Sequence, residues 1–354
     1  MSTDIEKVLD KARWAPSGDN EQPWRIKVLS PDSCEVTVGY FLNTPFHLER
    51  RPDHIALGGF IETFHIAAKD LGFEVRSMVK NPSDNVAPVY TFYIVKAANI
   101  IKDPLADVIE RRAVNRFPYS RKSLSEAQKQ QIEKSLPVGY TMVWFEGKER
   151  MTFAKVVYEA GIIRYVLPEM FTVHSKIIDW ENALSLDKVP SKAMGVPIIF
   201  LPLIKWLMGK RERMEGYNRF FKGDVSTALQ LEFLPSLFSA AGIAIIADKE
   251  PVVAQDWVEA GRAIQRFWLS AVSLGLAHQP AFTPLIFSKY ADKGLPLTTL
   301  EEVDMKNREM SRNLTILLGG EVQKNRAVWM GRVGFAGTIT SRSMRRPLAD
   351  FITE

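Results

Sequence analysis

Two apolar stretches far apart in the chain share one helical pattern. The first is GGFIETFHIAAKDLGF, which begins at Gly58, and the second is GRAIQRFWLSAVSLGL, which begins at Gly261. Apolar residues recur at intervals of three and four, and a final Gly stands where a helix would end. The matching positions are Gly58 and Gly261, Ile61 and Ile264, Phe64 and Phe267, Ala68 and Ala271, Leu71 and Leu274, and Gly72 and Gly275. The pattern predicts two long helices, alike either through composition alone or through an internal repeat.

The segments around these helices favour the repeat. Extended segments are predicted after each helix, at 73–79 and 89–95 in one case and at 276–282 and 313–320 in the other. Further helices are predicted at 4–13, 103–112, 124–135 and 150–165. Ser123 and Glu126 have the spacing of a capping box for the third of these. The whole pattern predicts an α+β protein of two related halves, residues 1–102 and 103–354, joined near residues 100–105.

Residues 165–238 do not fit either half and are interpreted as an insertion. The segment VPIIFLPLIKWLMG at 196–209 is the most apolar of the chain, and a basic stretch follows it. Two prolines and Lys205 interrupt the apolar segment, and it is shorter than a bilayer requires, so no membrane span is expected. The segment is predicted to be buried or to face another subunit, and the insertion to be a lid or an interface.

Composition and charge narrow the class of protein. Hydrophobic residues make up 46% of the chain, and 46 Lys and Arg stand against 41 Asp and Glu. No long basic stripe interleaved with aromatic residues is present, so no nucleic-acid partner is expected. A single cysteine, Cys34, excludes an intramolecular disulfide, and the first residues are too polar for a signal peptide; both favour a cytoplasmic protein. The five histidines lack metal-ligand spacing, so no metal site is expected.

Two polar clusters are candidates for ligand binding. The first is APSGDNEQPW at 15–24, either a plain turn before a strand or a loop whose amides and small side chains hold a ligand. The second is RRAVNRFPYSR at 111–121, whose arginines suit an anionic oxygen cluster but are equally compatible with a solvated helix end. A third basic run, SRSMRR at 341–346, is open to the same two interpretations.

These clusters carry a resemblance to a known family. APSGDNEQPW resembles the P-S-x-x-N-x-Q-P-W loop of the FMN-dependent nitroreductase-like superfamily, and RRAVNRF resembles its arginine motif. DWVEAGRAIQRFWLSAVSLGLAHQP is similar to the long central helix of the family with its following turn, and RRPLADFI to its C-terminal Arg-x-Pro tail. The insertion is similar only to a tandem branch, which includes flavin-sequestering members and domains found with E1-like adenylating domains.

The resemblance implies roles for individual residues. Pro16, Ser17, Gly18 and Asn20 match the flavin-contacting loop, while Gln22 and Pro23 would shape it and Trp24 would lie in the core. Arg111 matches the phosphate arginine, and Arg345 the tail arginine, with Arg346 as its neighbour and Arg342 as a further candidate. Gln279 and Pro280 match the turn at the ring edge. Ala113 replaces the Ser of the arginine motif, and Asn115 replaces its Arg or Lys, a charge that Arg116 or Arg121 would offset.

The motifs are divided between the halves. The first half has the loop but no arginine motif before it, and in the second half SLPVGYTMVWFEG stands where the loop should follow the arginines. Such a distribution predicts a nitroreductase-like fold in which two halves form an intramolecular pseudo-dimer, with mixed sheets flanked by helices and one composite FMN site per chain.

The resemblance also implies a function. FMN would be reduced by NAD(P)H and would pass electrons to a small organic substrate, with no protein side chain as catalyst. A flavin-sequestering protein with a lid and an accessory redox partner of a biosynthetic enzyme stay open as alternatives. The protein would work as a functional monomer, and a protein partner stays open.

Overall fold

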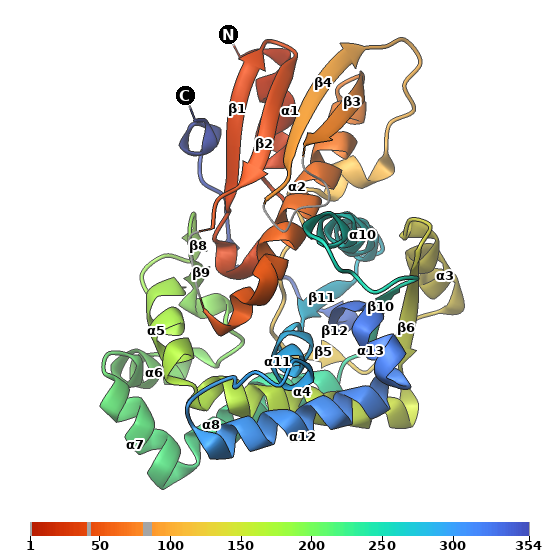
Figure 1. Ribbon diagram of the computed structural model, residues 1–354. Coiled ribbons are helices and arrows are strands. Elements are labelled where there is room, and N and C mark those ends of the chain that lie inside the picture. Colours follow the sequence, from red (N-terminus) through yellow and green to blue (C-terminus); the bar gives the residue numbers. More distant parts are fainter. Residues whose placement is uncertain (1, 41–43, 81–86, 354) are drawn as a thin grey trace.

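A computed structural model describes residues 2–40, 44–80 and 87–353 of the chain (Figure 1). The first half contains a four-stranded antiparallel sheet in the order β1-β2-β4-β3. Its strands are β1 (Trp24–Ser30), β2 (Ser33–Val38), β3 (Phe73–Lys80) and β4 (Val89–Lys96). Helix α1 (Asp4–Ala12) and helix α2 (Arg51–Asp70) pack on one face of this sheet. The predictions of helix 4–13 and of strands 73–79 and 89–95 are confirmed.

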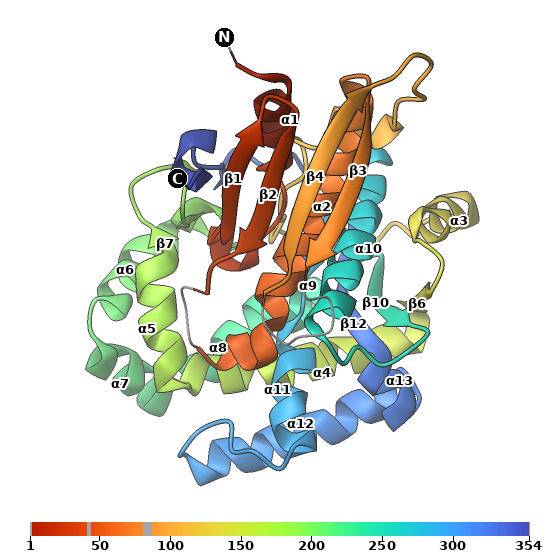
Figure 2. The same cartoon turned by 45° about the horizontal axis from the view of Figure 1, so that its top comes forward.

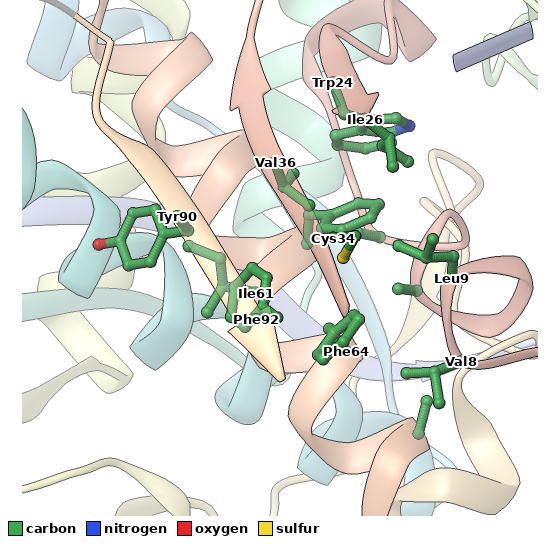
Figure 3. Packing of buried hydrophobic residues seen from close by; sticks show 14 of the residues in the cluster. Val8, Leu9, Trp24, Ile26, Cys34, Val36, Ile61, Phe64, Tyr90 and Phe92 are labelled. Atoms are coloured by element: carbon green, nitrogen blue, oxygen red, sulfur yellow. The ribbon is translucent and has the colours of Figure 1, made fainter. Parts of the chain in front are cut away.

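The core of the first half lies between this sheet and the two helices. Figure 3 shows Trp24, Cys34, Phe64 and Phe92 side by side in it, and all four are fully buried. The C-terminal end of the chain also contributes, because Phe351 packs against Trp24 with ring centroids 6.1 Å apart. The interpretation of Trp24 as a core residue is confirmed, and residues from both ends of the chain stabilise one core.

The second half is built on a five-stranded sheet with the main order β11-β12-β10-β6, and β5 pairs with β12. Its strands are β5 (Tyr119–Ser120), β6 (Tyr140–Phe145), β10 (Ala241–Ala247), β11 (Ala277–Pro280) and β12 (Ala327–Ala336). Strand β10 reads AGIAIIA and is buried along its whole length, as a central strand covered on both faces should be. One covering layer contains α4 (Gly147–Val166), α11 (Thr283–Asp292), α12 (Glu301–Leu318) and α13 (Glu321–Arg326), while α3 (Glu126–Ser135) lies at the β6 edge (Figure 1).

The α+β class is confirmed, but the sheets are not mixed in the way predicted. Every pair of strands within the two large sheets is antiparallel. Parallel pairing occurs in two short ladders, where β13 (Arg342–Ser343) pairs with β8 (Leu184–Ser185) and β7 (Ile178–Asp179) pairs with β9 (Val189–Pro190). These ladders connect the insertion to itself and to the C-terminal segment.

Helices α2 and α10 (Ala254–Ser273) lie side by side between the two large sheets (Figures 1 and 2). They meet at Gly58 and Gly261, the first matched pair of the predicted repeat. A Cβ atom on Gly58 would lie 1.9 Å from the carbonyl oxygen of Val258, and one on Gly261 would lie 2.2 Å from that of Ile55. The two predicted long helices are confirmed, and glycine is required at both positions because the backbone of the other helix occupies the space of a side chain.

Three predicted elements differ from the structure. Residues 313–320, predicted as extended, form the end of α12, because Leu314 and Leu318 face the core one helical turn apart from Met310. Residues 103–112 contain only a short 3₁₀ helix at Pro104–Val108. Helix α3 begins at Glu126, and its capping box uses Ser125 and Gln128. Each error concerns a boundary or a short apolar run, where periodicity is weakest.

The insertion forms a group of short helices at one side of the second half (Figure 1). They are α5 (Pro168–Ile177), α6 (Leu201–Met208), α7 (Arg211–Phe221), α8 (Gly223–Ala228) and α9 (Leu234–Leu237), with a π-helical turn at Leu229–Phe233 and the short strands β7, β8 and β9. Burial within the chain, one of the two predictions for 196–209, is wrong for half of its apolar residues, since Ile199 is 81% exposed and Ile198, Phe200, Leu203 and Trp206 are also exposed. The alternative, that the segment faces another subunit, stays a prediction. Across the three described ranges, no helix has the length and apolarity needed to cross a bilayer.

Candidate functional site

A cavity of about 610 Å³ lies between the two halves and the insertion. The first half contributes the loop at 16–20 and the beginning of α2. The second half contributes residues of α10, the segment after β11 and the C-terminal segment, and the insertion closes one side. The cavity therefore exists only because segments far apart in the sequence meet around the α2–α10 pair.

The loop at 16–20 is held in an unusual backbone conformation. Asp19, Asn20 and Gln22 all have positive φ angles, which cost free energy in residues other than glycine unless the surroundings fix them. The Oγ atom of Ser17 accepts a hydrogen bond of 2.9 Å from the backbone amide of Gln22, which closes the loop. Pro16, Ser17, Gly18 and Asn20 all line the cavity.

A hydrogen-bond network joins this loop to the C-terminal segment. The buried guanidinium of Arg345 donates to the Oδ1 atom of Asn20 at 2.7 Å and to the carbonyl oxygen of Ala15 at 2.8 and 2.9 Å. Asn20 donates from Nδ2 to the carbonyl of Leu186 at 3.1 Å, and Gln22 donates to the same carbonyl at 2.8 Å. The predicted shaping role of Gln22 agrees with these bonds, and the side chain of Asn20 is engaged inside the protein.

Besides Arg116 and Arg164, three arginines from two distant segments line the cavity. They are Arg112, Arg342 and Arg345, and within the described part of the chain none of them forms an ion pair with a carboxylate. Burial, followed by the neighbouring positive charges of Arg342 and Arg13, lowers the pKa of Arg345 to about 9. Burial, followed by the charges of Arg345 and Arg342, lowers the pKa of Arg112 as well. The charges repel one another, and an anion between them would remove that cost.

Arg112 and Arg116 of the arginine motif line the cavity, whereas the predicted Arg111 does not. Arg111 is exposed. Arg112 is 4% exposed, lies over the ring of Trp268 at 4.8 Å and donates to the carbonyl of Trp14 at 2.8 Å. The missed signal was helical spacing, since Arg112 follows the buried Val108 by four residues and its amide donates to the Val108 carbonyl.

Two other predicted residues lie outside the cavity lining. Asn115 is buried, donates to the carbonyl of Gly337 at 3.1 Å and accepts from the amide of Phe117, so it organises its own turn. Arg346 turns away toward the loop, where its backbone amide donates to the Oε1 atom of Gln22 at 3.0 Å. Asn115 and Arg346 thus form hydrogen bonds that stabilise the backbone next to the residues that line the cavity.

Gln279 and Pro280 line the cavity at the end of β11. The Oε1 atom of Gln279 accepts a hydrogen bond of 2.7 Å from the buried guanidinium of Arg332. The neighbouring His278 is fully buried, and burial lowers its pKa to about 3, so it is neutral at physiological pH. Its Nε2 atom accepts from the indole of Trp329, which also lines the cavity. This side of the cavity is rigid and mostly apolar.

The insertion side holds a polar group that sequence reasoning missed. Arg164 and Tyr165 at the end of α4 contact Glu232 of the π-helical turn; Arg164 forms an ion pair with Glu232, and the Tyr165 hydroxyl donates to it at 3.1 Å. Gly161 leaves room for Glu232, since a Cβ atom there would lie 2.8 Å from its Cγ. All four residues line the cavity. The predicted beginning of the insertion, residue 165, falls among these residues, and no sequence motif includes them.

One compact group of possible metal ligands lies beside the cavity. Glu21, His47 and Asp53 each offer one ligand atom within 4.8 Å of the others, and the Nε2 atom of His47 is 3.6 Å from Glu21 Oε2. Burial raises the pKa of Asp53 to about 6, and its Oδ2 atom is buried without a hydrogen-bond partner. The absence of a metal site stays a prediction.

Known proteins give only weak likenesses. No protein-family model and no curated protein matches the sequence. Among solved structures, the chain is similar to the FMN-dependent nitroreductase NfnB from Mycobacterium smegmatis in complex with NADPH, with 14% identity, a TM-score of 0.38, and 70% of this chain and 96% of that chain covered. A nitroreductase with bound FMN from Desulfitobacterium hafniense has 16% identity, a TM-score of 0.36, and coverage of 72% and 99%. A nitroreductase-like family protein from Bacillus cereus has 12% identity, a TM-score of 0.35, and coverage of 72% and 96%. Superpositions this poor do not establish a common fold, so the site stands on the residues of this chain.

Proposed function

We propose that this cavity binds FMN without a covalent bond and that the protein is an oxidoreductase with NAD(P)H as electron donor. The observation that carries the proposal is the group of Arg112, Arg342 and Arg345, whose charges face the cavity without a carboxylate partner in the described chain. Guanidinium groups donate charge-assisted hydrogen bonds to phosphate oxygens, and a phosphate would neutralise their repulsion.

The rest of the cavity fits a flat aromatic cofactor. Ser17 and Gly18 offer backbone and hydroxyl groups close to the arginines, while Trp268 and Trp329 give the interior apolar walls. A volume of about 610 Å³ falls in the range of small-molecule sites. A bound flavin supplies the hydride and electron transfer, and the protein supplies orientation and exclusion of water. No side chain is assigned a role as nucleophile, acid or base.

We also propose that the two halves form a tandem pseudo-dimer with one composite site. The matched glycines of α2 and α10 support this, because at both of them the backbone of the other helix occupies the space of a side chain. The division of the lining supports it too, since the loop at 16–20 comes from the first half and Arg112 from the second. Fusion of the halves makes their association independent of protein concentration.

Flavin sequestration is the second candidate. Residues of α6 and α7, including Leu207 and Tyr217, form a wall of the cavity on the insertion side. A wall in this position would separate a bound ring from a second substrate. This candidate predicts that FMN binds but is reduced slowly by NADH and NADPH.

The phosphate assignment is tested by a pair of adjacent substitutions. We expect Arg112→Gln to weaken FMN binding about tenfold to a hundredfold, because a charged hydrogen bond contributes about 1.5 to 3 kcal/mol. Arg111→Gln is the matched control and should leave the Kd unchanged. Titration of FMN fluorescence measures both, and Arg342→Gln provides a second lining variant at a residue that is only partly buried. Equal Kd values for all three variants and the unchanged protein would contradict the proposal.

Rapid mixing of the FMN-loaded protein with NADPH or NADH separates the two candidates. Bleaching of the flavin absorbance within seconds supports the oxidoreductase. A flavin that stays oxidised while tightly bound supports sequestration. A protein that retains no flavin after incubation with FMN contradicts both.

A further inference from the structure

The exposed apolar residues of the chain are concentrated in the insertion. In the described residues, every exposed Phe and Trp side chain belongs to the segment 198–221, and Ile199 and Phe221 are 81% and 73% exposed. The members of this apolar patch are Ile198, Ile199, Phe200, Leu203, Trp206, Phe220 and Phe221. Elsewhere the exposed apolar residues are aliphatic residues, Met and Tyr spread over many elements of the described chain, as is common in folded proteins. A concentration of this kind marks a binding surface.

Basic residues accompany the patch. The segment 196–223 contains six Lys and Arg residues and two Glu residues. Arg213 lies 4.5 Å over the ring of Trp206, and Arg219 lies 5.6 Å from the ring of Phe220. Lys210 and Lys222 flank α7 and form no ion pair with any described carboxylate. Apolar and cationic groups are therefore interleaved on the same two helices.

The combination of exposed apolar and basic side chains helps to choose between a protein and a membrane as the partner of this surface. Protein interfaces are depleted in lysine at their centres, whereas surfaces that lie on membranes combine Trp, Phe and Leu with Lys and Arg. The amphipathic pieces are also too short to span a bilayer, since α6 covers only Leu201–Met208. We propose that the α6–α7 face docks on the surface of a membrane that contains anionic lipids.

The same face borders the cavity. Phe200 and Leu203 line the cavity and are each 50% exposed, so one continuous apolar surface leads from the outside to the interior. Leu207 and Met208, further along α6, also line it. Docking through this face would direct the cavity toward the bilayer, where apolar molecules are dissolved. The inference of docking goes beyond the proposed flavin chemistry and does not depend on it.

Flotation with lipid vesicles tests the proposal. We expect the full chain to float with vesicles of phosphatidylcholine and phosphatidylglycerol, to bind pure phosphatidylcholine more weakly, and to be released partly by high salt. The double variant Ile198→Asp and Ile199→Asp should reduce the bound fraction at least tenfold. Ile101→Asp combined with Ile316→Asp is the matched control, because both residues are exposed isoleucines outside the patch.

The electrostatic part has its own variant. Lys210→Gln combined with Lys222→Gln should weaken binding to anionic vesicles about tenfold or more, since each basic residue near such a surface contributes about fivefold, and should leave binding to neutral vesicles unchanged. Circular dichroism and thermal unfolding verify that all variants remain folded.

Three results would overturn the proposal. One is absence of vesicle binding by the folded chain at low salt. Another is equal loss of binding in the patch variant and the control variant. The third is a dimer in light scattering that the patch variant converts to monomers while vesicle binding is absent, because the face would then be an interface between two copies of this chain.

Discussion

Two pairs of helices differ in their exposure to solvent. The α2–α10 pair is mostly buried, whereas the α6–α7 pair is largely exposed. The α2–α10 pair is buried between two sheets, and its backbones touch at Gly58 and Gly261. The α6–α7 pair lies at the edge of the molecule and exposes Trp206, Phe220 and Phe221. Burial of the first pair stabilises the fold, whereas the second pair leaves apolar area in contact with solvent. The comparison separates residues that hold the halves together from residues available for interactions.

The largest expected effect is at the crossing point. Gly261→Ala should lower the free energy of unfolding by more than about 3 kcal/mol, because its Cβ atom would lie 2.2 Å from the carbonyl oxygen of Ile55 and must push the helices apart. Urea denaturation followed by circular dichroism measures the loss. A change smaller than 1 kcal/mol would show that the helices separate easily and would remove the contrast between the two pairs.

The next largest effect on stability is expected when the carboxylate of Asp53, in the first turn of α2, is replaced by an amide. Burial is the main cause that raises the pKa of Asp53 from 3.8 to about 6; the charge of His47 opposes this shift and the charge of Glu21 adds to it. The folded state therefore binds a proton more tightly than the unfolded state, so stability falls as the pH rises from about 4 to 6. Asp53→Asn should stabilise the protein by about 2 to 3 kcal/mol at pH 8 and should have little effect at pH 4.

Thermal unfolding of both proteins across this pH range checks the sign. The gain should begin near pH 4, where the carboxyl group ionises in the unfolded state, and should reach its full size near pH 7. If Asp53→Asn destabilised the protein at pH 8, the ionised carboxylate would have a stabilising partner, and a bound cation among Glu21, His47 and Asp53 would be the first to test.

A smaller effect of opposite sign is expected in the second pair. Gly216 lies within α7, and no atom would come within 4 Å of a Cβ atom there. Gly216→Ala should therefore stabilise the protein by about 0.5 to 1 kcal/mol, since alanine favours the helix without a clash. The same substitution thus has opposite consequences in the two helix pairs, and equal signs in urea denaturation would contradict the assignment of α7 as an open helix.

The smallest effect is expected on the apolar patch itself. Ile199→Ser should change the free energy of unfolding by less than about 0.5 kcal/mol, because its side chain is 81% exposed and contributes little to the core. Differential scanning calorimetry of the isolated chain measures this. A loss of 2 kcal/mol or more would place Ile199 in a packed environment and would argue against a free α6 face.

The sequence predicted what long periodic segments determine. Both long helices and the strands at 73–79 and 89–95 were recognisable because many positions repeat one pattern. The end of α12 was misread because Leu314, Ile316 and Leu318 alternate like a strand, although the buried residues are four apart. Short apolar runs do not distinguish the two periods.

The candidate site was predicted in part for a related reason. A loop with several turn residues identified Pro16, Ser17, Gly18 and Asn20, which line the cavity, and the C-terminal arginines identified Arg345. Motif matching compares residue types and does not show which side chain of a helical turn points to the interior. It therefore could not distinguish Arg112 from Arg111. The residues Arg164, Tyr165 and Glu232 meet through tertiary packing alone, which no local pattern encodes.

The bonds among Asn20, Gln22 and Arg345 have a consequence for the thermodynamics of ligand capture. Because these side chains already satisfy one another and the carbonyls of Ala15 and Leu186, the loop is preorganised before any ligand arrives. Association then orders little backbone, so the unfavourable entropy of binding should be small. Isothermal titration calorimetry of a variant with a loosened loop, such as Asn20→Ala, should show a more negative binding entropy than the unchanged protein.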